Sequence, residues 1–477
     1  MVIAVIVLAL YFVVGSLIAV ISRRAGIKST FDYYVAGYRL GGLLAAMTYA
    51  ATTYSAFMMI GLVGFAYATG IGAFGFENLY LLATVFLLAL FAHKVWRMAR
   101  ERKWISPAEM IGDLYGSKLL AAVIAVVYLV ALIPYSTAQL VGIGNLFEGL
   151  GLGYLTGVIA GAFIVFLWIY LAGIWSVATT DAYQGIWMIA AALGFIVWIT
   201  GYLLPSNGLD VGKAFEVLGG EGYLGITSFW APSVFLAFTL PWIFFAVTNP
   251  QVVQRLYMPR DEKALNAMIR YFAVFGLVYT VIVTLIGLFA RALTITGVFP
   301  NLENRDLTTP TLLSMAHPLL SAIVFTSIVA AAISTLDSII LTLASCIQRD
   351  VYRGRGDSRR ELIVGYIVIV VLVAITSIVA LLRPGFVVEL SVLSSVLLLP
   401  LAPVTITAWI TPEKVRDRYR SALTAITIGF GIGVYAALVY GPRKAFIQTI
   451  LGLPISLWIL LVSSAILVAG LSLEERV

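Results

Sequence analysis

The stretch YAATTYSAFMMIGLVG, residues 49 to 64, places three hydroxyl side chains close together inside a long apolar run and follows them with two glycines. These residues predict a helix that is interrupted within the membrane. A second interruption is expected in FFAVTNPQVVQR, residues 244 to 255, because Pro250 lacks a backbone N–H and clashes with the carbonyl four residues earlier. Discontinuous helices at corresponding positions in two halves of a chain are typical of membrane transporters.

The composition is that of an all-α membrane protein. Of the 477 residues, 61% are hydrophobic and only 11% are charged. Thirteen apolar runs are long enough to cross a hydrocarbon core about 30 Å thick, and backbone groups at that depth must be satisfied within a helix. We predict thirteen transmembrane helices, at residues 2–22, 41–69, 72–93, 119–147, 154–174, 178–204, 229–255, 264–293, 318–345, 361–382, 386–411, 421–440 and 446–470.

The two interrupted runs are the second and the seventh, and a separation of five indicates a five-plus-five inverted repeat. We expect an additional N-terminal helix and loop in residues 1–40, a first repeat in 41–204, a second repeat in 205–411 and two C-terminal helices in 412–477. Most Lys and Arg residues fall in alternate loops when the N-terminus is placed outside, so we predict a cytoplasmic C-terminus. This topology explains the net charge of +7 without a nucleic-acid partner.

Several function classes lack the residues that they require. One cysteine and two histidines leave no Cys/His cluster for a metalloenzyme, and the short glycine groups have no nucleotide-loop spacing. We find neither a constellation of nucleophile and base nor a repeated selectivity filter, so an enzyme or a channel is disfavoured. The expected partners are the lipid bilayer and a small-molecule solute, and no obligate protein partner is evident.

A polar stripe lies in AAAISTLDSII, residues 330 to 340. Ala331, Ser334, Thr335 and Ser338 are spaced so that they share one face of a helix. Three aligned hydroxyls without a charge suit a monovalent hard cation that must be released on every cycle. Asp337 flanks this stripe and does not lie in it.

Asp337 and Asp181 are ionisable residues inside predicted spans. A carboxylate at bilayer depth costs roughly 2.5 to 3.5 kcal/mol, so each is a candidate functional residue. Asp181 lies in WSVATTDAYQGIW near the predicted cytoplasmic end of its span, where an ordinary helix N-terminal acid is an equally good interpretation.

The chain resembles the sodium:solute symporter family, whose members share the LeuT-type inverted-repeat fold. The similarity lies in seven stretches that follow one another in family order over residues 30 to 355. They are FDYYVAGYRLGG (31–42), YAATTYSAFMMIGLVG (49–64), SPAEMIGDLYGSK (106–118), AQLVGIGNLFE (138–148), TTDAYQG (179–185), NPQVVQR (249–255) and AAAISTLDSIILTLASCIQRDVYR (330–353).

The resemblance implies a site for a transported, coupling sodium ion. Its ligands would be the carbonyls of Ala51, Tyr54 and Ala331 and the hydroxyls of Ser334 and Thr335. Some members hold a second sodium with an acid at the Asp181 position and hydroxyls at the positions of Asp337 and Ser338. Here an acid replaces one hydroxyl, so these three residues are candidates either for a second cation site or for the release path. Two carboxylates could also share a proton or attract a cytoplasmic base such as Arg349.

The resemblance also implies a substrate site beside the two broken helices, formed by Thr53, Ser55, Phe57, Thr248, Asn249 and Gln251. Sugar-transporting members carry a polar residue where this chain has Phe57, Met58 and Met59, and proline-type members carry an acid where it has Thr53. A small carboxylate-bearing solute, an organic acid or an amino acid, fits better.

We therefore predict sodium-coupled symport by alternating access, in a multi-pass protein of the plasma membrane, here a prokaryotic inner membrane. A proton-coupled transporter of the same fold and a sodium-coupled sugar transporter remain as alternatives.

Overall fold

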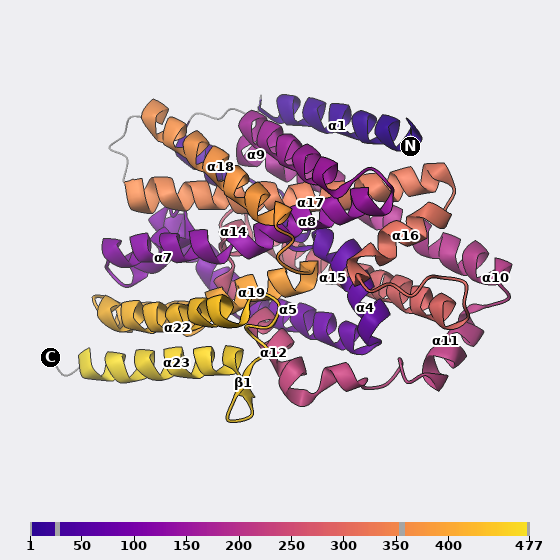
Figure 1. Cartoon of the computed structure of the whole chain (residues 1–477). Coiled ribbons are helices and arrows are strands. Elements are labelled where there is room, and N and C mark those ends of the chain that lie inside the picture. Colours follow the sequence, from indigo (N-terminus) through magenta and orange to yellow (C-terminus); the bar gives the residue numbers. More distant parts are fainter. Residues whose placement is uncertain (1, 24–28, 353–357, 475–477) are drawn as a thin grey trace.

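The computed structural model describes residues 2–23, 29–352 and 358–474, which form a bundle of helices with one small hairpin (Figure 1). The longest helices are α1 (Val2–Arg23), α5 (Gly72–Arg102), α8 (Ile133–Gly149), α9 (Tyr154–Trp198), α15 (Glu262–Ile295), α17 (Pro318–Cys346), α18 (Ser358–Leu381), α22 (Tyr419–Tyr440) and α23 (Ile455–Glu474). The helices of intermediate length are α3 (Gly42–Thr53), α6 (Pro107–Leu114), α7 (Lys118–Ala131), α11 (Val211–Gly220), α12 (Pro232–Ile243), α16 (Thr308–Met315), α19 (Val387–Leu398) and α20 (Leu401–Ile410).

Short elements complete the bundle. The short α-helices are α2 (Thr30–Val35), α4 (Val63–Thr69), α10 (Leu204–Ser206), α13 (Phe245–Thr248), α14 (Pro250–Arg255) and α21 (Pro412–Val415). Tighter or wider helical turns occur at η1 (Ala36–Tyr38), η2 (Phe57–Leu62), η3 (Ile199–Leu203), η4 (Ser228–Trp230), η5 (Arg305–Leu307) and η6 (Ile347–Tyr352). Strands β1 (Thr449–Ile450) and β2 (Leu453–Pro454) pair antiparallel, and the turn between them uses Leu451 and Gly452 at positive φ.

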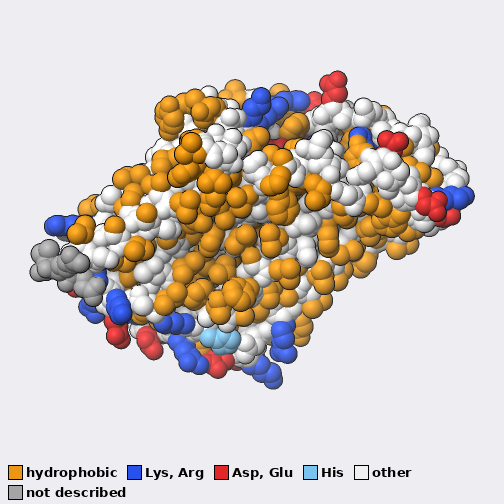
Figure 2. Space-filling model, turned by 90° about the horizontal axis from the view of Figure 1, so that it is seen from below, with side chains coloured by type: hydrophobic (Ala, Val, Ile, Leu, Met, Phe, Trp, Pro, Cys, Tyr) orange, Lys and Arg blue, Asp and Glu red, His pale blue; other side chains and the backbone are white. Residues whose placement is uncertain are grey.

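The surface is that of a protein that spans a membrane. Among the described residues, nine helices are long and apolar enough to cross a bilayer, or up to eleven if each of two bent pairs is one span. Figure 2 shows hydrophobic side chains over the middle of one face, with charged side chains gathered toward its edges. Large apolar side chains such as Phe86, Phe163 and Leu438 are exposed, which suits contact with lipid.

Helical segments lie within each of the thirteen predicted runs, but two of these segments are short for a span. Apolar helical segments of only 10 to 17 residues cover the fifth and seventh runs, at Tyr154–Ile169 and Pro232–Ile243. Helix α9 covers the fifth run and most of the sixth and is broken at Gly173 (φ 50°). The last run, 446–470, was expected to be helical throughout but opens with the β1–β2 hairpin, and α23 begins only at Ile455. The count of thirteen spans therefore stays a prediction. Helix α1 begins at one end of the bundle and α23 ends at the other (Figure 1). Residues 24–28 and 353–357, which are parts of two basic loops used for the predicted orientation, lie outside the described residues.

Both expected interruptions are present. Helix α3 ends at Thr53, Tyr54 is extended, and the chain resumes as the π-helix η2 and then α4, with a bend of 48°. In the second interruption α13 ends at Thr248, Asn249 is extended with ψ 115°, and Pro250 opens α14. Proline costs little at this first helical position, because its missing N–H would have no partner inside the helix.

A third break was not predicted. The run 386–411, which we expected as one span, divides into α19 and α20 with a bend of 54°. Pro400 lies in the two-residue gap between these helices and cannot donate to the preceding turn. A proline inside an apolar run is a signal that the sequence analysis used at Pro250 and did not apply here.

Candidate functional site

The first candidate site lies where α17 crosses the end of α3. The Ser334 Oγ donates to the Ala51 carbonyl at 2.9 Å and to the Ala331 carbonyl at 3.0 Å, and the Thr335 Oγ1 donates to the Ala51 carbonyl at 3.1 Å. Because α3 stops at Thr53, the Ala51 carbonyl is among the last four of the helix and lacks a helical donor. Four neutral oxygens from two helices therefore converge, all on buried residues.

Tyr54 is the one predicted sodium ligand that these contacts do not include. It is buried directly after α3, and its ring stacks on Phe272. The Thr335 Oγ1 contacts the Thr52 carbonyl at 3.3 Å instead. The structure thus brings Ala51, Ala331, Ser334 and Thr335 together and leaves Tyr54 one turn along the broken helix.

A charged layer lies one turn further along α17. The Thr48 Oγ1 donates to the Asp181 Oδ2 at 2.6 Å, and the Ser338 Oγ lies 2.8 Å from the Thr52 Oγ1. Asp337 interacts electrostatically with Asp181. Both carboxylates are buried and each has one oxygen without a hydrogen-bond partner. The residues proposed for a second cation or a release path are therefore neighbours.

Arg255 belongs to this layer, and its position corrects the sequence analysis. As the last residue of the predicted span 229–255, it is counted with the basic residues at the cytoplasmic side when the orientation is predicted. It is 1% exposed, its Nη2 donates to the Ser338 Oγ at 2.7 Å, and its charge interacts with Asp181. Arg349, the base that we expected near the two carboxylates, instead pairs with Glu109 at 2.8 Å. Arg255, at the boundary of its predicted span, therefore points into the bundle and not into the loop.

At the first break, the chain also supplies acceptors for the free backbone N–H groups. The Ala56 N–H donates to the Gln139 Oε1 at 3.2 Å, and the Phe57 N–H donates to the Ser55 Oγ at 3.1 Å. The Tyr135 hydroxyl donates to the Thr53 carbonyl at 3.3 Å, while the Thr53 Oγ1 donates within its own helix. Gln139 and Tyr135 were not among the predicted site residues, although a buried Gln in an apolar run is a usable signal.

At the second break, several buried side-chain atoms have no hydrogen-bond partner. Thr248 donates within its helix to the Phe244 carbonyl at 3.0 Å, and the Asn249 Nδ2 donates to the Thr248 Oγ1 at 3.3 Å. The Asn249 Oδ1 and both amide atoms of Gln251 are buried without a hydrogen-bond partner. Buried polar atoms usually have partners, so these three atoms are suited to receive a ligand.

Aromatic side chains connect the two breaks. Trp242 contacts Phe57 edge-on with ring centroids 5.5 Å apart, and it also packs against Tyr80 at 5.4 Å and Tyr135 at 6.4 Å. Four aromatic rings thus link η2 of the first break to α12, which precedes the second. Of the predicted substrate residues, Phe57 takes part in these ring contacts, and Thr53 is reached through its carbonyl by Tyr135.

Glu77 is a buried acid in this aromatic region that the sequence analysis missed. It is 1% exposed, its Oε2 has no hydrogen-bond partner, and it interacts electrostatically with Tyr54, Tyr80 and Tyr135. It lies in the run 72–93, so the rule that singled out Asp181 and Asp337 also applies to it.

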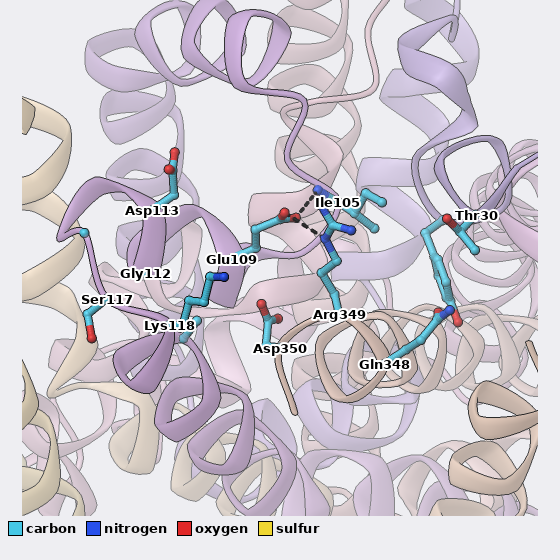
Figure 3. Close-up of a pocket in the computed structure, with 13 residues that line it drawn as sticks. Thr30, Ile105, Glu109, Gly112, Asp113, Ser117, Lys118, Gln348, Arg349 and Asp350 are labelled. Atoms are coloured by element: carbon cyan, nitrogen blue, oxygen red, sulfur yellow. Dashed lines mark hydrogen bonds and ion pairs between the residues drawn. The ribbon is translucent and has the colours of Figure 1, made fainter. Parts of the chain in front are cut away.

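A cavity of about 560 Å³ opens at the far end of α17 (Figure 3). Its lining includes Ile105, the Glu109–Arg349 pair, Lys118 and Asp350, and Figure 3 shows these side chains around one opening. Buried polar contacts lead from Ser338 toward it. The Thr342 Oγ1 donates to the Ser338 carbonyl and to the Gln254 Oε1, both at 2.8 Å, and the Gln254 Nε2 donates to the Ile105 carbonyl at 2.8 Å.

Comparison with known proteins identifies the family. The sequence pattern of the sodium:solute symporter family matches residues 33–406, which is most of the chain. The chain belongs to the sodium:solute symporter family. Its members are transporters, not enzymes, and the apolar helices of this symporter make it a multi-pass protein of the plasma membrane.

Two relatives of this symporter come from bacteria. The chain is 26% identical over 360 residues to a sodium/pantothenate symporter of Haemophilus influenzae, covering 72% of this chain and 70% of the relative. It is 26% identical over 382 residues to sodium/proline symporter 2 of Staphylococcus saprophyticus, covering 75% and 70%. A sodium-coupled sialic acid symporter in a substrate-bound outward-open state has the same fold, with a TM-score of 0.79, 17% identity and coverage of 98% of this chain and 96% of that one.

Proposed function

We propose that this symporter couples the inward movement of sodium to uptake of a small amino-acid-like solute by alternating access. The observation that supports this most directly is the convergence of four neutral oxygens at the broken end of α3. Neutral carbonyl and hydroxyl oxygens suit a hard monovalent cation and permit its release. The hydroxyls of Ser334 and Thr335 now donate to carbonyls, and rotating these protons away would turn the same oxygens into cation ligands.

We propose that the solute binds between the second break and the aromatic region. The unpartnered atoms of Asn249 and Gln251 are hydrogen-bonding groups suited to a solute carboxylate or amide. Glu77 favours an amino acid over a simple organic acid, because a buried acid would repel a solute that carries only negative charge and would pair with an ammonium group. Proline, named for one relative, carries both groups, whereas pantothenate, named for another, carries only the carboxylate.

We also propose the thirteen-span topology with a five-plus-five inverted repeat, with the N-terminus outside. The two predicted helix breaks and the opposite ends of the bundle at which α1 begins and α23 ends support it. The ion would leave toward the cytoplasm along the hydroxyl-bearing face of α17, past Arg255, into the cavity of Figure 3. A proton-coupled transporter is the rival, with Asp181 or Asp337 as the carrier.

Uptake into proteoliposomes tests the proposal. Labelled amino acids, organic acids, pantothenate and sugars are offered with a sodium gradient, with a pH gradient alone and with neither. We expect accumulation of an amino acid only with the sodium gradient. Accumulation driven by the pH gradient without sodium would favour the proton-coupled rival, and accumulation of a sugar would overturn the solute class.

A second arm tests the role of Glu77. Glu77→Gln is expected to weaken amino-acid uptake strongly and to leave an organic acid unaffected or better accepted. Glu216→Gln, an exposed acid in α11, is the matched control. Equal effects on both solute classes would remove the ammonium contact from the proposal.

A further inference from the structure

The first helix, α1, lies outside the two proposed repeats, yet one of its side chains points into the bundle. Many of its large apolar side chains are exposed, as suits contact with lipid, and Leu10 is 62% exposed. The next residue, Tyr11, is only 1% exposed. Its ring packs against three aromatic rings of α9, those of Trp168, Tyr183 and Trp187, with centroids 5.4 to 6.0 Å away. Figure 1 shows α1 beside α9 at one edge of the bundle.

Helix α1 contacts α9 on both sides of its break. Gly173 has φ 50° and divides α9 into two parts. On the first part, Trp168 lies so close to α1 that a Cβ at Gly15 would be 2.6 Å from its ring. On the second part, the Ser176 Oγ donates to the Ala19 carbonyl at 2.8 Å. Small residues and interhelical hydrogen bonds hold membrane helices close together, so the place of Tyr11 relative to α9 is well defined.

The Tyr11 hydroxyl accepts a hydrogen bond from a buried amide of α9. The Gln184 Nε2 donates to it at 2.7 Å. Gln184 lies one turn from Asp181, whose Oδ2 accepts from the Thr48 Oγ1 at 2.6 Å and whose Oδ1 has no hydrogen-bond partner among the described residues. Side chains three residues apart on a helix are neighbours, and a Gln amide can donate to an Asp in this position. If Tyr11 did not bind it, the Gln184 amide could therefore turn to Asp181.

We infer that Tyr11 is a positioning residue, which holds the Gln184 amide away from Asp181 so that Asp181 stays bonded to Thr48 of α3. Thr48 lies one turn before Ala51, whose carbonyl is a proposed sodium ligand. Helix α1 thereby helps to set the position of the first broken helix, although its own residues touch neither ion nor solute. The inference rests on the proposed sodium coupling. It does not depend on the charge of Asp181, because a carboxyl oxygen accepts hydrogen bonds in either protonation state.

The experiment measures sodium-driven solute uptake by proteoliposomes as a function of sodium concentration, together with thermal unfolding in detergent. Tyr11→Phe removes the hydroxyl and keeps the ring contacts. We expect the sodium concentration for half-maximal uptake to rise roughly threefold, which is the size of effect that one side-chain hydrogen bond between membrane helices typically has. The KM for solute at saturating sodium and the unfolding temperature should stay those of the parent.

A second variant separates positioning from packing. Tyr11→Phe with Gln184→Leu replaces both hydrogen-bonding partners by apolar groups, which costs little stability, and leaves no amide that can turn to Asp181. We expect this double variant to recover the sodium dependence of the parent, which a merely structural role of the Tyr11 contact would not allow. Leu10→Ala, at the neighbouring exposed position of α1, is the matched control.

Unchanged sodium dependence in Tyr11→Phe overturns the inference, as does a double variant that is as impaired as the single one. If Tyr11→Phe alone does not elute as a folded protein, the double variant carries the test. Sodium dependence like that of the parent then supports the positioning role, and a raised half-maximal sodium concentration overturns it. Absence of any sodium-driven uptake in the parent would overturn the proposed function instead.

Discussion

The two predicted helix breaks differ in how their free polar groups are satisfied. At the first break, the Ala51 carbonyl accepts from α17 and the Ala56 N–H donates to Gln139. At the second, the Asn249 Oδ1 and the amide atoms of Gln251 are buried without partners. The chain therefore supplies hydrogen-bond partners for the polar groups at the first break, whereas side-chain atoms at the second break have none.

This difference matches two kinds of ligand. At the first break, hydroxyls and carbonyls form hydrogen bonds with each other while no ion is bound. A bound ion would replace these hydrogen bonds, because the same oxygens would then coordinate it. A solute brings hydrogen-bond donors and acceptors of its own. The Asn249 and Gln251 side-chain atoms that would bind it therefore have no partner within the chain. We expect substitutions at the first break to change sodium dependence, and those at the second to change solute affinity.

The largest effect is expected from the hydroxyls of α17. Ser334→Ala or Thr335→Ala removes a candidate ligand, so the sodium concentration for half-maximal uptake should rise by at least roughly tenfold, which corresponds to a loss of about 1.4 kcal/mol. Ser377→Ala in α18, whose hydroxyl bonds only within its own helix, is the control. Unchanged sodium activation in both variants would separate the first break from ion binding.

An effect of at most the same size is expected at the second break. Gln251→Leu removes two polar atoms that have no partner in the chain, so the thermal stability of the protein should stay the same or rise. The KM for solute should rise by roughly tenfold, because one hydrogen bond worth about 1 to 2 kcal/mol is lost. Stability is measured by thermal unfolding in detergent. A marked loss of stability with unchanged KM would show that Gln251 is a structural residue.

Gln139 should affect stability and not solute affinity. Gln139→Leu leaves the Ala56 N–H buried without a partner, which we expect to cost about 1 to 3 kcal/mol of the free energy of unfolding. Gln139→Glu keeps an acceptor oxygen at the same place and should recover part of this loss as the neutral acid, because burial disfavours its charged form. Equal stability of the parent and the Leu variant would mean that the first break is not held together by this contact.

The smallest effect is expected from Asp337, which flanks the sodium ligands without being one. Asp337→Asn keeps shape and polarity but cannot titrate, so sodium-driven accumulation should persist, at most at a lower rate. Uptake is measured at several external pH values for the variant and the parent. Loss of accumulation with retained solute exchange, together with uptake by the parent under a pH gradient alone, would make Asp337 a proton carrier.

Local sequence determined the features that depend on neighbours along the chain. Pro250 ends a helix because its ring and missing N–H act within one turn. Ser334, Thr335 and Ser338 share a face because a helix has a fixed period. The apolar runs identified a membrane protein because a bilayer imposes one length on every span. These inferences needed no knowledge of which helices touch.

Tertiary packing decided everything that depends on partners far apart in the sequence. Ser334 meets a carbonyl 283 residues away, and Ala56 meets an amide 83 residues away. Arg255 has the same chemistry in a loop and in a core, and only the position of α14 against α17 turned it inward. Glu77 likewise meets Tyr54 and Tyr135, which lie on segments other than its own helix. The sequence alone determines which side chains a helix presents on each face, whereas the charge and hydrogen bonds they meet arise only when the helices pack.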